Sequence, residues 1–196
     1  MIVETVNQKL LDFIFRFPRT GFTLREIAKR LDISHTIVAS TIKNLEKSDL
    51  VRVVRDRVSF KVYGNLDSEE FRDLKRVYNL FSILDLKNFL IKELAPSLIV
   101  VYGSYSKGID SEDSDIDLFV ETFSKKNLDF SRFESKLKRN IHVIKGSFRK
   151  LPKETLASPL PFFWIISCFK RLLCKRKFPG GRRRLRVILL CRKRRR

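Results

Sequence analysis

The chain has 196 residues, of which 43% are hydrophobic and 11% aromatic, and its formal net charge is +20. This length permits two small domains with a modest core each. No run of about 18 apolar residues occurs, and the N-terminus has no basic-then-apolar leader. We therefore expect a cytoplasmic protein without a membrane span.

The first sixty residues have the pattern of three helices and a hairpin. An apolar stripe at helical spacing predicts the first helix: Val6, Leu10, Phe13, Ile14 and Phe17. A capping box of Thr23 and Glu26 predicts the start of a second helix, and Ser34 can cap a third, whose apolar residues Val38, Ile42 and Leu45 would face inward. Two alternating segments, 50–54 and 58–62, then predict a hairpin.

This order of elements, together with the amino-acid sequence of residues 24–31 and 34–45, resembles the winged helix-turn-helix of prokaryotic regulators. The resemblance implies DNA as a partner, with the third helix in the major groove and the hairpin against phosphates. The candidate contacts are exposed polar residues of that helix and arginines of the hairpin: His35, Thr36, Ser40, Thr41, Lys43, Asn44, Arg55 and Arg57. Alternatively, this module only packs against the second domain or forms a homodimer.

The next segment, residues 65–95, is predicted to form one or two linking helices. Asn65 to Glu70 is polar and turn-prone, and Phe71, Leu74 and Val77 then begin a helical apolar pattern that continues to Pro96. We expect these helices to pack on a sheet formed by the residues that follow.

Residues 98–120 contain the most informative pattern in the chain. An apolar strand, 98–102, is followed by Gly103, where the backbone can turn sharply, and by Ser104, whose hydroxyl and N–H suit a phosphate oxygen. A short helix starting near Ser106 would add N–H groups to this phosphate site, and Lys107 would add positive charge.

Two carboxylates follow on a second predicted strand. Because alternate residues of a strand share a face, Asp115 and Asp117 would point one way while Ile116 and Leu118 point into the core. Adjacent carboxylates repel each other unless a cation lies between them, and an all-oxygen pair suits Mg²⁺. The alternative is a polar loop that leads into an ordinary strand with solvated aspartates.

The whole segment, from Gly103 to Asp117, has the pattern G-S-x10-D-x-D. It resembles the signature of the polymerase-β nucleotidyltransferase superfamily, in particular the minimal nucleotidyltransferases, over about residues 95–145. The resemblance implies that Asp115 and Asp117 are catalytic and bind Mg²⁺, and that Gly103 and Ser104 hold the phosphates of ATP or another NTP. Because related proteins often act as antitoxins, it also implies a hydroxyl acceptor on a toxin-like partner protein or on RNA.

The superfamily places a third carboxylate on a later strand, where this sequence has His142 within the predicted strand 140–144. An imidazole accepts a proton or ligates a metal, but it does not replace an anionic bridge for Mg²⁺. Candidate substitutes for the acid lie in the preceding loop: Asp110, Glu112 and Asp113. Two hypotheses remain, an active nucleotidyltransferase and a DNA-binding transcriptional regulator with an inactive transferase domain.

The predicted fold class is α+β, with a winged helix-turn-helix domain (1–64), linking helices (65–95) and a small mixed-sheet nucleotidyltransferase domain (96–160). The basic tail, 161–196, differs in composition, because residues 160–196 hold 14 of the 42 Lys and Arg residues and no Asp or Glu. Three interpretations of the tail remain: a disordered nucleic-acid-binding arm, a membrane-surface anchor, and a non-native end caused by a shifted reading frame near residue 160.

Overall fold

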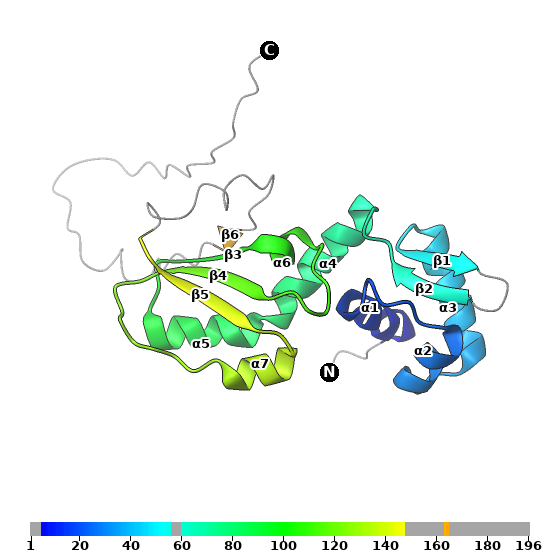
Figure 1. Cartoon of the computed structure of the whole chain (residues 1–196), viewed down its shortest axis with the longest axis horizontal. Helices are drawn as coiled ribbons and strands as arrows, with labels where there is room; N and C mark the ends of the chain where they lie inside the picture. The colour runs from blue at the N-terminus through cyan, green and yellow to red at the C-terminus, as the bar shows by residue number, and fades with distance from the viewer. Residues whose placement is uncertain (1–4, 56–59, 148–162, 165–196) are drawn as a thin grey trace, which may run out of the picture.

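The computed structural model describes residues 5–55, 60–147 and 163–164. Its elements form two groups, one at each end of an elongated molecule, with helix α4 running between them (Figure 1). The N-terminal group contains α1 (Val6–Arg16), α2 (Leu24–Leu31), α3 (His35–Lys47), β1 (Val51–Arg55) and β2 (Phe60–Gly64). The predicted order of helices and hairpin is therefore present.

Side-chain caps fix where the N-terminal helices begin. Thr23 and Glu26 form the predicted capping box of α2, and the Ser34 hydroxyl accepts a hydrogen bond from the N–H of Ile37 at the start of α3. A second capping box, formed by Thr5 and Gln8 at α1, was not predicted. These helices enclose one hydrophobic cluster with the hairpin, including Leu10, Ile27, Val38, Ile42 and Val62.

Helix α4 (Glu69–Ser82) connects the two groups, and of the three apolar residues that predicted its pattern only Phe71 is buried. Phe71, Lys75 and Asn79 are its buried residues, whereas Leu74 and Val77 are each 44% exposed. Spacing of four residues places the three buried side chains on one helical face. Phe71 packs in the N-terminal cluster, and the two polar residues find hydrogen-bonding partners in the second group.

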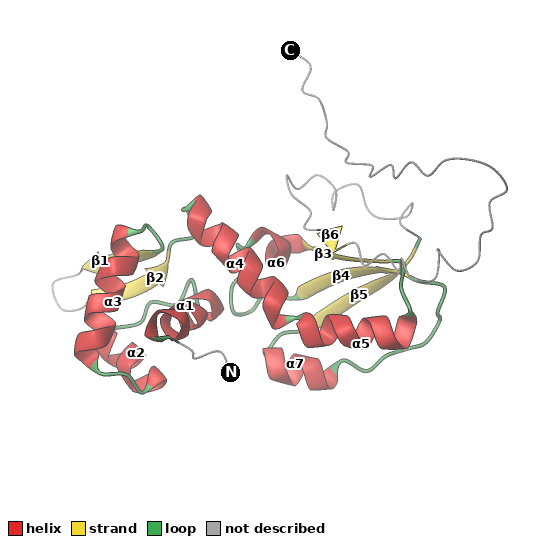
Figure 2. Cartoon of the chain, turned by 180° about the vertical axis from the view of Figure 1, so that it is seen from behind, coloured by secondary structure: helices red, strands yellow, loops and turns green. Residues whose placement is uncertain are grey.

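The second group is a mixed sheet in the strand order β5-β4-β3-β6. Strand β3 (Leu98–Tyr102) pairs antiparallel with β4 (Ile116–Glu121), which pairs parallel with β5 (Ile141–Gly146). Helices α5 (Leu84–Leu94) and α7 (Ser131–Leu137) lie on the same side of this sheet, as the view from behind shows (Figure 2). The chain is thus α+β with a small mixed sheet, as predicted.

A second hydrophobic cluster lies between the sheet and these two helices. Leu86, Leu90 and Leu94 of α5 pack there with Phe133 of α7 and with the inward residues of the strands, such as Ile116. Since residues alternate along β4, the side chains of Asp115 and Asp117 belong to the opposite side of the sheet.

The predicted tail lies almost wholly outside the described residues. Within it the structure describes only β6 (Phe163–Trp164), which pairs antiparallel with β3 at Ile99 and Val100. The three interpretations of residues 161–196 therefore stay predictions. Among the described helices, none is long and apolar enough to cross a membrane.

Candidate functional site

The candidate site lies where β3 ends beside the start of β4. Pairing of Tyr102 with Asp117 brings the turn at Gly103 next to the second carboxylate. Gly103 has a φ of +72°, and a Cβ atom at this position would lie 2.4 Å from Oδ2 of Asp117. The positive φ favours glycine here, and any side chain at this position would displace the carboxylate of Asp117.

Helix α6 (Gly103–Lys107) starts at the turn itself, three residues earlier than predicted. Ser104 is therefore in its first turn and half-buried, while the Ser106 hydroxyl donates a hydrogen bond of 3.0 Å back to the carbonyl of Gly103. Lys107 is exposed at the end of the helix, and its carbonyl accepts a hydrogen bond from Arg76 of α4. The expected phosphate-binding residues thus lie on one short element beside the carboxylates.

The two aspartates share one face, and the apolar residues between and after them point away. Ile116 and Leu118 are buried, whereas the side chains of Asp115 and Asp117 are 37% and 29% exposed. Burial raises the pKa of Asp117, and the charge of Asp115 raises it further, while His142 opposes both. A bound cation would relieve this repulsion.

His142 lies directly beside the carboxylate pair. The parallel register pairs it with Asp117 across β4 and β5, and its Nδ1 is 3.7 Å from Oδ1 of Asp117 and 3.8 Å from Oδ2 of Asp115. The imidazole is 61% exposed. A residue that the sequence did not indicate joins the site, because Asn140 donates a hydrogen bond of 3.0 Å to Oδ1 of Asp115.

Residues 85–157 match the family model "Polymerase beta, Nucleotidyltransferase". The matched region begins in α5 and includes the turn, both aspartates and His142, and it supports membership of this part of the chain in the polymerase-β superfamily. No curated protein and no solved structure matches the chain significantly.

Nucleotidyltransferases of this family usually use an NTP with a divalent metal. Within the described part of the chain, no group of three or more His, Cys, Asp or Glu side chains is arranged to hold a metal ion. The aspartate pair still fits Mg²⁺, because its donors are all oxygens and Mg²⁺ commonly takes its remaining ligands from water and substrate phosphates. The space that glycine leaves beside Asp117 is consistent with this fit.

Three carboxylates of the loop before β4 were candidate substitutes for the missing acid, and the structure excludes one of them. Asp110 is fully buried and pairs with Lys75 and Arg139, so it is committed to the structure and cannot face a nucleotide. Glu112 accepts a hydrogen bond from Thr20 of the N-terminal group. Asp113 is exposed. Of the three candidates, Asp110 is thus excluded because its carboxylate is already paired.

The predicted DNA-contacting residues of α3 are exposed with one exception: His35, Thr36, Ser40, Lys43 and Asn44 are exposed, whereas Thr41 is only 7% exposed. Thr41 follows Val38 by three residues and so lies on the helix's inner face, and the prediction that its side chain is exposed is therefore wrong. Arg55 is exposed but donates to both carboxylate oxygens of Glu46 at 2.9 Å. Arg57 lies outside the described residues.

Proposed function

We propose that the chain transfers a nucleoside monophosphate from an NTP, ATP in the first instance, to a hydroxyl group of an acceptor. The observation that carries the proposal is the contact of Gly103 with the Asp117 carboxylate, which brings the turn and the aspartate pair together. The family match over residues 85–157 supports the same chemistry.

In this reaction the acceptor oxygen forms a bond to the α-phosphorus, the bond from that phosphorus to its bridging oxygen breaks, and pyrophosphate leaves with the electron pair. Catalysis of this kind is mainly positioning and electrostatic stabilisation. We assign binding of the terminal phosphates to Ser104 and to the turn at Gly103, with Lys107 adding positive charge.

Asp115 and Asp117 would hold Mg²⁺, which when bound neutralises phosphate charge and stabilises the leaving group. Asn140 keeps the first carboxylate in place through its hydrogen bond. We assign the acceptor's proton to His142, which lies beside both carboxylates and is exposed enough to pass the proton on to solvent. The acceptor would be a protein hydroxyl, as on a toxin-like partner, or an RNA end.

Incorporation of label from α-labelled ATP tests this proposal. The full-length protein is incubated with α-labelled ATP and Mg²⁺ in three separate reactions: alone, with RNA and with cell extract. We expect the double variant Asp115→Asn/Asp117→Asn to transfer the label at least about a hundredfold more slowly than wild type. Asp67→Asn is the matched control, because that side chain is 90% exposed and lies outside the site. Transfer that survives in the double variant would refute the proposal.

A second candidate function is that of a DNA-binding transcriptional regulator whose transferase region has lost catalytic activity. Two observations favour it: His142 pairs with Asp117 in the strand register, where the family resemblance implies a third acid, and α3 has exposed polar side chains beside a hairpin. In this view the N-terminal group is a winged helix-turn-helix, and the protein acts as a homodimer on DNA. Gain of transfer in His142→Asp would identify a weakened enzyme, whereas an inactive wild type that binds duplex DNA would support the regulator.

A further inference from the structure

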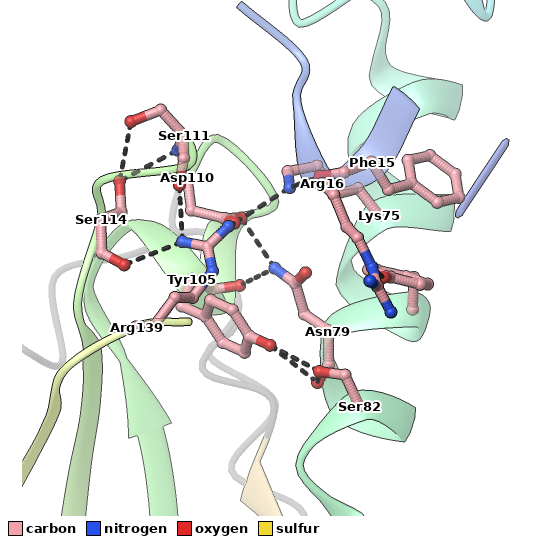
Figure 3. Close-up of polar contacts among 11 residues, drawn as sticks. Phe15, Arg16, Lys75, Asn79, Ser82, Tyr105, Asp110, Ser111, Ser114 and Arg139 are labelled. Atoms are coloured by element: carbon pink, nitrogen blue, oxygen red, sulfur yellow. Dashed lines mark hydrogen bonds and ion pairs between the residues drawn. The ribbon is translucent and has the colours of Figure 1, made fainter. Parts of the chain in front are cut away.

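The spacer between Ser104 and Asp115 contains one fully buried carboxylate, Asp110 (Figure 3). Its Oδ2 lies 2.9 Å from Nζ of Lys75 and 3.0 Å from a guanidinium nitrogen of Arg139, and its Oδ1 accepts a hydrogen bond of 2.7 Å from Asn79. A buried carboxylate is costly unless it is paired and hydrogen-bonded, and here both oxygens are. We call these four residues the Asp110 cluster.

Other hydrogen bonds of the cluster reach both halves of the candidate site. Asn79 also donates to the carbonyl of Tyr105 in α6, at 2.8 Å. Arg139 donates to the carbonyls of Ser111 and Ser114, at 2.5 and 2.8 Å, and the second of these residues directly precedes the first aspartate. The cluster thus connects the element that starts with the glycine turn to the loop that leads into the carboxylates.

The cluster also contacts the N-terminal group. Nζ of Lys75 donates a hydrogen bond of 2.6 Å to the carbonyl of Phe15, near the end of α1. A second contact lies close by, where the hydroxyl of Thr20 donates to Oε1 of Glu112 in the same loop. The other oxygen of Glu112 is buried without a partner among the described residues, so the hydroxyl of Thr20 matters for this carboxylate.

We propose that the Asp110 cluster is a positioning unit that fixes the loop before Asp115 relative to the turn at Gly103, and that the Lys75–Phe15 bond and the Thr20–Glu112 contact together transmit the state of the N-terminal group to this loop. Since the same ammonium group bonds to both α1 and the loop, a change in one alters the bonds available to the other. Its consequence for nucleotide binding rests on the function proposed above. By linkage, a ligand of the N-terminal group would change nucleotide affinity and the nucleotide would change affinity for that ligand.

Hydrogen–deuterium exchange of the full-length protein tests the positioning role without any ligand. Peptides that cover residues 108–115 are compared between Lys75→Met and Arg76→Met. Arg76 is the matched control, because it is the next residue of α4 and also donates to a backbone carbonyl, that of Lys107. We expect loop exchange to rise about tenfold in Lys75→Met and less than about twofold in Arg76→Met. Equal exchange in the two variants would overturn the inference.

A double-mutant cycle tests transmission and uses variants that leave the buried charges in place. Ile27→Ala loosens the N-terminal core, where that side chain is 1% exposed, and Thr20→Val removes the hydroxyl that contacts Glu112. We expect Ile27→Ala to speed loop exchange by at least about threefold, and by clearly less when Thr20→Val is also present. The same acceleration in both backgrounds, or none in either, would overturn the inference even if Lys75→Met does not fold.

Calorimetric binding of Mg-ATP to the same proteins links the cluster to function. We expect Lys75→Met to bind about tenfold more weakly than wild type and Arg76→Met to bind within about twofold. A wild type that binds neither Mg-ATP nor any other Mg-NTP would refute the proposed function, and the exchange cycle would still decide whether the contacts with the N-terminal group transmit its state to the loop.

Discussion

Replacement of Gly103 by alanine should separate the stability of the fold from the geometry of the site. The new Cβ would lie 2.4 Å from Oδ2 of Asp117, at a residue whose φ is +72°. The carboxylate is the free end of a side chain and can move away, so the clash does not break the fold. The left-handed backbone remains, and it should lower the free energy of unfolding by about 1–2 kcal/mol.

The size of the effect on function follows from the same distance. To reach ordinary van der Waals contact at 3.4 Å, the carboxylate oxygen has to move by about 1 Å. Misplacement of a catalytic group by about 1 Å costs about a hundredfold in rate, which equals about 2.7 kcal/mol of activation free energy. We therefore expect a folded variant with about one hundredth of the wild-type transfer rate.

Two other glycines provide controls for this experiment. A Cβ on Gly146 would have its nearest neighbour at 4.0 Å, so Gly146→Ala should be neutral. A Cβ on Gly108 would lie 2.3 Å from the carbonyl oxygen of Arg72, which cannot move freely, so Gly108→Ala should lose stability instead. Urea denaturation and label transfer are measured on all three. A Gly103→Ala protein that is folded and retains more than about a third of the wild-type rate would refute the reasoning.

Three further predictions concern stability and DNA binding. Burial raises the pKa of Tyr105 to about 12 from 10.0, so the phenol of the unfolded chain loses its proton first as the pH rises. The free energy of unfolding should therefore fall by about 2–3 kcal/mol between pH 10 and 12, and Tyr105→Phe should lack this contribution in urea denaturation. If Lys43 contacts phosphate, Lys43→Ala should weaken duplex DNA binding in fluorescence anisotropy and reduce the slope of log affinity against log salt concentration by about 1. Lys92→Ala on α5 is the control and should change neither quantity. An unchanged slope in Lys43→Ala would remove Lys43 from the interface. Thr23→Ala should cost about 1 kcal/mol in thermal unfolding through loss of the α2 cap, and Thr23→Ser should retain most of it; equal losses would contradict the capping role.

Local patterns predicted the elements of the fold well, because their causes are local. The capping box at Thr23 marks the start of α2, and the apolar run Leu98–Tyr102 coincides with β3. Alternation in β4 correctly predicted that Ile116 would be buried and that the aspartates would face the other side. His142 lies beside the aspartates because β5 follows β4 in parallel register.

The contacts across the molecule could not be predicted in the same way. In the sequence Asp110 resembled a turn residue, because no described residue close to it in the chain pairs with it. Its partners Lys75 and Asn79 precede it by 35 and 31 positions, on a helix whose apolar residues suggested another buried face. Thr41 shows a different error, because three-residue spacing from Val38 already indicated burial and its polarity suggested a surface position.

The position of α4 has a consequence for how the transferase region could be separated from the rest. The family match starts at residue 85, after α4 has ended, so residues 85–157 alone would contain Asp110 without Lys75 or Asn79. Arg139 would then be its only remaining cation in the cluster. A truncated protein that retains the partners of Asp110 therefore has to be larger than the matched segment and to include α4.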